Sequence, residues 1–284
     1  EHRPDFCRQR VGNSLMKAVV FAAGMGTRLK PFTDRHPKAL VDIDGEAMLG
    51  HVLLKIKAAG ISEVIVNVHH FASQIVDYLK ARNDFGMTVH ISDESALLLD
   101  TGGALALLYR RGLLENCDSV LVHNADIMTD FSLRDFSRAF AVETGAEAML
   151  LVDSTRSSTR KLLFDRDSMC MCGWQNENTG QIRPEGLTPR KAEKCMKAAF
   201  GGVHIISVGT FADIADYAAR IAKKAPEADN LDGIVPFSIT DYYIGMCRKN
   251  FFCAYQPAEA YRWFDVGRPE SLEKARKAFA KSRN

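Results

Sequence analysis

The first regular stretch of the chain reads MKAVVFAAG over residues 16–24 and continues as MGTRLKPFTDRHPKAL to residue 40. The apolar run that starts at Met16 predicts a buried strand. Small residues follow the strand directly, and they let main-chain N–H groups approach an anion closely; they are Ala22, Ala23, Gly24 and Gly26. The stretch therefore predicts a strand that ends in a phosphate-binding loop.

Two basic residues strengthen the prediction of a phosphate ligand. Arg28 carries a fixed fork of donors that suits phosphate oxygens, and Lys38, held after the rigid Pro37, adds a compact positive charge. Two other phosphate motifs do not fit, because a dinucleotide fingerprint needs glycine where Leu29 stands and a Walker A loop needs Gly-Lys-Ser/Thr. A bare G-x-G after a strand is explained equally well as a structural turn, so the specificity lies in the full string.

Strands and helices alternate through the first half of the chain. Segment 47–60 predicts a helix that ends at Gly60 and buries one apolar face, made of Met48, Leu49, Val52, Leu53 and Ile56. The neighbouring patterns predict further elements, with strands at 63–68, 87–92 and 119–123 and helices at 72–82 and from Thr101. This alternation predicts a doubly wound, mostly parallel, Rossmann-like α/β sheet, whose ligands bind beyond the carboxyl ends of the strands.

The second half is more mixed, and we expect it to complete the sheet and wall a pocket within a single domain. Its patterns predict strands at 146–153, 161–164, 169–174, 200–207, 251–255 and 261–266, and helices near 210–223 and 237–248. A turn-rich polar segment, 175–189, interrupts this pattern. No internal repeat or low-complexity tract is visible.

The bulk composition is that of an ordinary globular protein, with 284 residues, 46% hydrophobic and 25% charged. Because 37 basic residues nearly balance 35 acidic ones, we expect no nucleic-acid or anionic-membrane partner. The seven cysteines are never spaced C-x-x-C, and no apolar run is long enough to span a membrane, which predicts reduced thiols in a cytoplasmic protein. Residues 1–15 are polar and patternless, and we expect a leader there, disordered or packed on the body, before a natural start at Met16.

One string of residues resembles a family signature. The pattern G-x-G-T-R-L-x-P-x-T…P-K-x-L-V is present as Gly24, Gly26, Thr27, Arg28, Leu29, Pro31, Thr33, Pro37, Lys38, Leu40 and Val41, and it resembles that of the nucleoside-diphosphate-sugar pyrophosphorylases. The resemblance covers nearly the whole chain after Met16, through DTGGAL (100–105), VHNADIMTD (122–130), FGGVHIIS (200–207) and WFDVGRPESL (263–272). It is strongest to N-acetylmuramic acid-1-phosphate uridylyltransferases and short mannose-1-phosphate guanylyltransferase-like proteins.

The resemblance implies a catalytic set of Arg28, Lys38, Asp126 and Asp265, with one Mg²⁺ on the two aspartates. Each aspartate follows a predicted strand, where a carboxylate is explained equally well as a cap or turn residue. Hard oxygen ligands together with triphosphate oxygens are what Mg²⁺ requires. The implied nucleotide-binding residues are Ala22, Ala23, Gly24, Gly26, Thr27, Arg28, Thr101, Gly102 and Gly103. The implied halves are a nucleotide-binding part, 16–130, and a sugar-phosphate-binding part, 131–284.

Two of the implied segments have a physical interpretation beside the family one. Thr101-Gly102-Gly103 is typical of a helix N-terminus, whose exposed N–H groups favour anionic partners, although a plain loop-to-helix junction fits as well. The implied sugar-phosphate-binding residues are Asn124, Gly201, Gly202 and His204. A bulge in the strand would explain the two glycines equally well, and for His204 a packed core histidine is the simpler interpretation.

The family activity is the transfer of a nucleotidyl group from a nucleoside triphosphate, UTP or GTP by the nearest resemblance, to a sugar-1-phosphate, with release of pyrophosphate. Three alternatives stay open: a choline-phosphate cytidylyltransferase of the same fold, a catalytically silent relative, and a glycosyltransferase. The last usually shows Asp-x-Asp, whereas Asn124-Ala125 precedes Asp126 here. Ala39 stands where many relatives carry proline, and 175–189 matches no sugar-contacting motif. Base, sugar and the choice between monomer and homo-oligomer are left undetermined.

Overall fold

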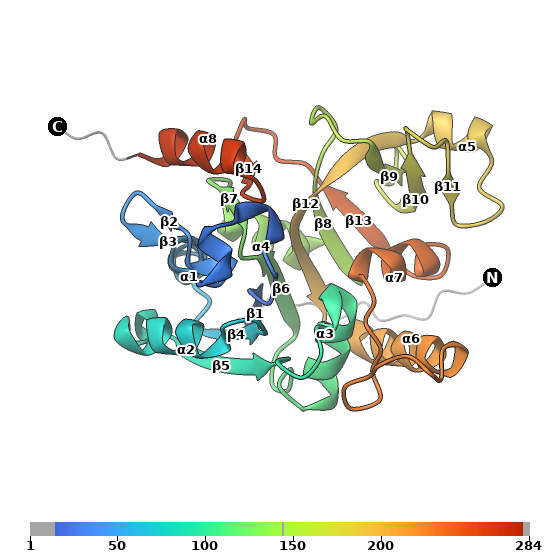
Figure 1. Cartoon of the computed structure of the whole chain (residues 1–284). Coiled ribbons are helices and arrows are strands. Elements are labelled where there is room, and N and C mark those ends of the chain that lie inside the picture. Colours follow the sequence, from blue (N-terminus) through green and yellow to red (C-terminus); the bar gives the residue numbers. More distant parts are fainter. Residues whose placement is uncertain (1–14, 144, 281–284) are drawn as a thin grey trace.

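The computed structural model describes residues 15–143 and 145–280 (Figure 1). The expected leader therefore lies outside the described residues apart from Leu15, whose main chain exchanges hydrogen bonds with Asp118. Ten strands form one large sheet. Helices pack on both of its faces, which confirms the predicted α/β class with a mostly parallel central sheet.

The first half of the chain builds the parallel part of the sheet. The strand order is β6-β1-β4-β5, and all three of these pairings are parallel. The strands are β1 (Met16–Phe21), β4 (Glu63–Val68), β5 (Thr88–Asp93) and β6 (Ser119–Asn124). Because β1 lies between β4 and β6, the chain runs outward from β1 in one direction and later returns to its other side. That reversal of strand order is where ligands bind in open α/β sheets.

The second half extends the sheet with antiparallel strands. The long strand β12 (Met196–Ser207) pairs antiparallel with β6, and its other edge pairs with β8 (Ala148–Asp153), to which β13 (Phe252–Tyr255) is parallel. The start of β12 also leads into a small antiparallel lobe at the upper right of Figure 1. This lobe consists of β9 (Arg160–Phe164), β10 (Met171–Asn176), β11 (Ile182–Arg183) and α5 (Pro189–Lys194).

Alternate residues of the central strands enter two separate cores. Ala18 and Val20 pack with helices α1 (Met48–Ala58), α2 (Ala72–Ala81) and α4 (Leu133–Val142). Val19 faces the opposite core, with helices α3 (Asp100–Arg110), α6 (Thr210–Lys224) and α7 (Ile239–Met246). The five apolar positions predicted for the first helix are all buried in α1. The predicted buried strands and the predicted covering of both faces of the sheet are thus confirmed.

Several elements were absent from the sequence-based prediction. Helix α4 begins at a Ser132 cap, whose hydroxyl accepts from the N–H of Asp135, and helix α8 (Pro269–Phe279) follows the last strand. The other missed elements are short: β2 (Asp42–Ile43), β3 (Glu46–Ala47), β7 (Ile127–Thr129), β11, α5 and four one-turn helices at Thr27–Leu29, Phe32–Asp34, Lys38–Leu40 and Asn83–Gly86. The strand predicted at 261–266 is reduced to β14 (Trp263–Asp265), which pairs with β7.

Two further observations concern the described residues. Among their helices, none is long and apolar enough to cross a membrane. The six cysteines that they include are all free.

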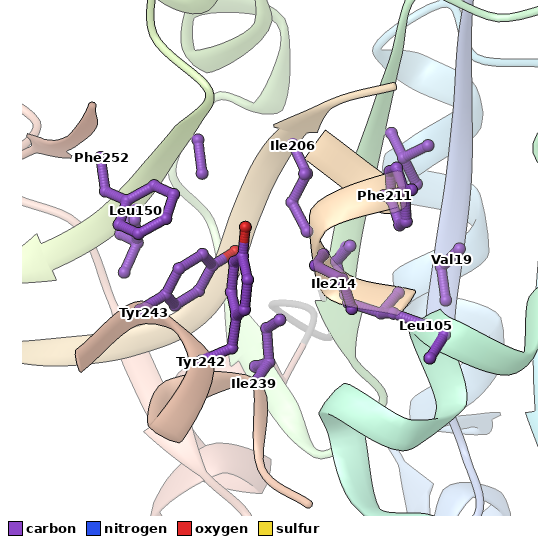
Figure 2. Packing of buried hydrophobic residues seen from close by; sticks show 14 of the residues in the cluster. Val19, Leu105, Leu150, Ile206, Phe211, Ile214, Ile239, Tyr242, Tyr243 and Phe252 are labelled. Carbon is purple, nitrogen blue, oxygen red and sulfur yellow. The ribbon is translucent and has the colours of Figure 1, made fainter. Parts of the chain in front are cut away.

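The core between α3, α6 and α7 is closed by aromatic side chains (Figure 2). Tyr242, Tyr243 and Phe252 are in mutual ring contact, and Phe211 at the start of α6 is fully buried. These side chains pack α6 and α7 against the central sheet.

We predict that Phe211→Ala lowers the free energy of unfolding by about 3–5 kcal/mol, because it leaves a cavity in this core. Val142, which is 77% exposed at the end of α4, provides the control. Val142→Ala should change the free energy of unfolding by less than about 0.5 kcal/mol. Urea unfolding followed by circular dichroism measures both values, and equal effects would contradict this account of the core.

Candidate active site

A cavity of about 310 Å³ opens where the strand order reverses. It lies beyond the carboxyl ends of β1, β4 and β6, as the fold class predicts. Its walls are Phe21, Ala22, Ala23, Gly24, Lys38, Ala39, Asn67, Leu98, Asp100, Thr101, Asn124, Ala125 and Asp126. Residues of the predicted phosphate loop therefore face the residues that follow β6 across one pocket.

In the phosphate loop, the prediction that the N–H groups of Ala22 and Ala23 face an anion needs correction. The N–H groups of Ala22 and Ala23 both donate to Oδ1 of Asn67, at 2.8 and 3.3 Å, so they are not free for an anion. Over the described chain, the main-chain N–H groups from Gly24 to Arg28 donate to no protein acceptor. The part of the loop that can bind an anion is therefore 24–28.

Gly26 is required by the shape of this loop. Its φ of 62° is in the left-handed region, and a Cβ there would lie 2.8 Å from both Lys38 Cβ and Thr33 Cγ2. The Thr33 hydroxyl donates to the Gly26 carbonyl at 2.9 Å. Glycine at this position lets the loop pass directly over Lys38.

Lys38 and Asp126 form an ion pair inside the pocket. Lys38 begins a one-turn helix after Pro37 and is only 9% exposed. Asp126 follows β6 by two residues, and its carboxylate is the acceptor of the Lys38 ammonium. A buried ammonium with one carboxylate partner is a cation that an incoming phosphate can recruit.

The β7–β14 pairing brings Asp265 beside Asp126. Asp265 lies opposite Ile127 in the ladder, and the N–H of Val266 donates to the Asp126 carbonyl at 2.9 Å. Arg28 approaches from the other side, since a Cβ on Gly267 would lie 2.7 Å from its Nη2 and 3.0 Å from Asp265 Oδ1. The structure therefore gathers all four residues of the predicted catalytic set.

The electrostatics of Asp265 fit a cation site. Desolvation by the surrounding protein raises the pKa of its carboxyl, and the neighbouring Asp126 charge raises it further, while Lys38, Arg28 and Arg156 oppose the shift. In the described chain, no group of three or more histidine, cysteine or acidic side chains is arranged so that it could hold a metal ion by itself. Asp126 and Asp265 would supply carboxylate oxygens, the type of ligand that Mg²⁺ prefers.

The Thr101-Gly102-Gly103 segment needs a second correction. Helix α3 starts at Asp100, and the N–H groups of Gly102 and Gly103 donate to the carbonyl of Phe237 at 2.8 and 3.2 Å. The Thr101 hydroxyl accepts from the N–H of Ile239, so it does not cap its own helix. A Cβ on Gly102 would lie 2.3 Å from the Phe237 ring. These glycines dock α3 on the 237–239 segment, and only Thr101 of the three lines the pocket.

The sugar-side glycines lie at a bulge. The register of β12 against β8 shifts between Phe200 and His204, and Gly202 has a φ of 71°. A Cβ on Gly202 would lie 3.1 Å from Nδ2 of Asn124, which itself lines the pocket. A contact of Gly201 and Gly202 with a sugar phosphate stays a prediction.

His204 does not reach the pocket. It is 1% exposed, its Nδ1 is hydrogen-bonded to the Tyr243 hydroxyl, and its ring packs edge-on against Phe200. Burial lowers the pKa of its imidazole to about 3, so the ring is neutral in this environment. The side chain therefore packs in the core, as the simpler interpretation of the sequence expected.

Sequence reasoning missed the residues that fix the pocket loops. Nδ2 of Asn67, at the end of β4, donates to Glu94 Oε1 at 3.0 Å, and Glu94 Oε2 accepts from the Leu99 N–H. Glu94 is fully buried, and this burial raises the pKa of its carboxyl. The network joins the phosphate loop to the segment before α3. The only signal in the sequence was a polar residue inside the apolar run EVIVNV.

The fold and the placement of these four charged residues are those expected of a nucleotidyl-transferring enzyme, and comparison with known proteins shows that class. A family model described as nucleotidyl transferase matches residues 17–160. The N-acetylmuramate alpha-1-phosphate uridylyltransferase of Caulobacter vibrioides is 30% identical over 261 residues, covering 89% of this chain and 93% of the relative. The chain belongs to the nucleotidyl transferase family.

Other relatives share a part of the chain or the fold. The mannose-1-phosphate guanylyltransferase catalytic subunit beta of Dictyostelium discoideum is 32% identical over 146 residues, which are 51% of this chain and 40% of that protein. A crystal structure of a UDP-glucose pyrophosphorylase complexed with UDP-glucose superposes with a TM-score of 0.67 at 16% identity, covering 93% of this chain and 98% of the other. The last likeness concerns the fold alone.

We predict that Asn67→Ala raises the KM for the nucleotide, because the N–H groups of Ala22 and Ala23 lose their acceptor and the phosphate loop loosens. The substitution also leaves Glu94 buried with one partner fewer, which should cost about 1–3 kcal/mol of stability. Steady-state kinetics at saturating sugar phosphate, together with thermal unfolding, measure both effects. A nucleotide KM equal to that of the wild type would show that the network does not set the loop.

Proposed function

We propose that the protein transfers a nucleotidyl group from UTP or GTP to a hexose-1-phosphate, including N-acetylated ones, and releases pyrophosphate. The Lys38–Asp126 ion pair beside Asp265, at the reversal point of the sheet, is the observation that carries the proposal. The uridylyl- and guanylyltransferase names of the relatives support the choice of bases.

In this proposal the chain's own residues position two anions for direct attack. The free N–H groups of 24–28 and the Arg28 guanidinium hold the triphosphate. An oxygen of the sugar phosphate attacks the α-phosphorus in line, the bond to the pyrophosphate oxygen breaks, and no covalent enzyme intermediate forms. Positioning and electrostatic stabilisation then account for most of the rate.

Asp126 and Asp265 would hold the Mg²⁺, which when bound supplies positive charge to the phosphate oxygens. Lys38 is released from Asp126 as the triphosphate enters, because the phosphate replaces the carboxylate as its partner. The ammonium is then placed to follow charge that moves from the α-phosphate to the leaving pyrophosphate. Its burial strengthens this interaction, since little water screens it.

The other side of the pocket would receive the sugar phosphate. Asn124 lines the pocket and lies beside the β12 bulge at Gly201 and Gly202. The lobe β9–β11 with α5 continues β12 beyond this bulge, so the polar segment 175–189 falls within it. We place the reaction in the cytoplasm, which the free cysteines of the described chain support.

A substrate matrix tests the proposal. UTP, GTP, CTP, ATP and dTTP are each combined with several sugar-1-phosphates, and pyrophosphate release is measured with and without Mg²⁺. We expect UTP or GTP with a hexose-1-phosphate to be the best pair and to depend on Mg²⁺. A preference for CTP with phosphocholine would favour the cytidylyltransferase alternative, and no pyrophosphate release from any pair would favour a silent relative.

The two aspartates should differ in their effect on folding. Asp126→Asn and Asp265→Asn should each lower kcat about a hundredfold or more, since both remove charge from one ion site. Asp126→Asn also leaves the buried Lys38 without its counter-ion and should destabilise the fold, whereas Asp265→Asn should stabilise it at neutral pH. The raised pKa of Asp265 means that its charged form is unfavourable in the folded state.

Thermal unfolding across a pH series checks this difference. The stabilisation by Asp265→Asn should be present above the raised pKa of Asp265 and vanish as the pH falls below the ordinary aspartate range, where the wild-type carboxyl is protonated. The double variant should lose scarcely more activity than either single one. Near-normal Mg²⁺-dependent activity in either single variant would contradict a shared ion.

A further inference from the structure

Arg156 lies in the loop between β8 and β9 and is fixed from two directions. Its guanidinium carbon stands 3.7 Å from the ring centre of Trp263, two residues before Asp265 on β14. Its Nη2 donates to the carbonyls of Ala199 at 2.9 Å and Phe200 at 2.6 Å, directly before the glycine bulge of β12. One side chain therefore spans the strand of a catalytic carboxylate and the sugar-side strand.

Trp263 completes the connection between these strands. Its indole Nε1 donates to the Gly201 carbonyl at 2.9 Å. The carbonyls of three consecutive residues, from Ala199 to Gly201, thus accept from the Arg156–Trp263 pair. A β-bulge interrupts the hydrogen bonds between neighbouring strands. Side-chain donors that bind the freed carbonyls therefore fix the distance between the bulged glycines and the neighbouring strand.

The backbone of the Arg156 loop is also held in place. The Asp153 carboxylate accepts from the N–H groups of Thr155 and Arg156, and the Lys161 ammonium donates to the Arg156 carbonyl at 2.7 Å. Lys161 is itself only 8% exposed. The guanidinium is therefore preorganised, so Arg156 loses little conformational entropy when substrate binds.

Two polar atoms around the Arg156 side chain still lack a hydrogen-bond partner. In the described part of the chain, Nη1 of Arg156 and the Tyr261 hydroxyl are both buried and have no protein partner. The charges of Arg156 and Asp265 also influence each other. Neutralising a nearby charge requires only a positive group, whereas Arg156 also stacks on Trp263 and donates to two carbonyls.

From these contacts we infer that Arg156 is a positioning residue for the sugar-phosphate side of the reaction. Through Trp263 and the carbonyls of Ala199 and Phe200, it sets the distance between the β12 bulge and Asp265. The inference rests on the proposed function, because it concerns the second substrate of that reaction. In this inference, different contacts fix the two sides of the pocket. The Arg156–Trp263 pair fixes the sugar-phosphate side, and the Asn67–Glu94 network fixes the nucleotide side.

The test compares two variants of this residue, Arg156→Lys and Arg156→Met, with the best substrate pair of the wild-type enzyme. Both should raise the KM for the sugar-1-phosphate about tenfold or more and lower kcat, since small displacements of a bound reactant are costly, while the KM for the nucleotide stays within about twofold. Lysine keeps the charge but cannot stack and donate to both carbonyls. It should therefore not rescue the enzyme.

Two controls make the result specific. Arg220 on α6 also stands over an aromatic ring, that of Tyr217 at 5.7 Å, away from the residues that line the pocket. Arg220→Met should leave both KM values unchanged. Asn67→Ala should give the opposite pattern from the Arg156 variants, with a raised nucleotide KM and an unchanged sugar-phosphate KM.

Two further measurements do not depend on turnover. The chain has two tryptophans, so a Trp174→Phe background leaves Trp263 as the only one, and Arg156→Met should shift its emission maximum. Calorimetric titration of the sugar-1-phosphate, with a non-hydrolysable nucleotide analogue bound, should show weaker binding in both Arg156 variants. Trp263→Phe keeps an aromatic ring and loses the bond to Gly201, and its effect on binding should not add to that of Arg156→Met.

The outcomes separate this inference from the proposed function. Equal increases of both KM values, or an unchanged sugar-phosphate affinity alongside shifted Trp263 emission, would overturn the role of Arg156 and leave the activity standing. A wild-type enzyme that releases no pyrophosphate from any pair would overturn the proposed function, and the inference would fall with it.

Discussion

The position of β1 between two parallel neighbours is the constraint on which the rest of this structure depends. Parallel strands cannot be joined by tight turns, so each crossing requires a helix on one face of the sheet. The crossings from β1 outward to β4 and β5, and then back to β6, place α1 and α2 on one face and α3 on the other. The loops after β1 and β6 lead to α1 and α4 on one face, and the segment before α3 leads to the other face. Residues of all three segments line the pocket.

The charges in that pocket follow from its place in the sheet. Asp126 comes two residues after β6, and the short β7–β14 pairing sets Asp265 next to it. Arg28 and Lys38 balance these two carboxylates, so the four side chains carry no net charge together. A triphosphate adds several negative charges to this balance. In the proposed reaction Arg28 and Lys38 would not neutralise these charges alone, which supports the proposal that a divalent ion held by the two carboxylates completes the site.

Much of the fold and the charged residues of the site could be predicted from the sequence. Buried apolar runs and the apolar face of α1 defined the sheet and its layers, since periodicity reports burial directly. Arg28, Lys38, Asp126 and Asp265 were found through their resemblance to a family, and the structure brings them together. Residue type alone predicted free N–H groups at Ala22, Ala23, Gly102 and Gly103, and there it was wrong. Whether an N–H is free depends on an acceptor elsewhere in the chain, here Asn67 and Phe237.

The parts that the sequence did not predict share one physical origin. Asn67 with Glu94, and Arg156 with Trp263, are contacts between segments distant in the chain. No local periodicity marks such a pair, because each residue looks like an isolated polar position. Both pairs are buried or half-buried and satisfy main-chain groups of the loops that line the pocket or border it. Buried hydrogen-bond networks are costly to rearrange, so they hold these loops in a single arrangement. In the proposed reaction, Lys38 then exchanges its partner Asp126 for a phosphate, while the walls of the pocket stay in place.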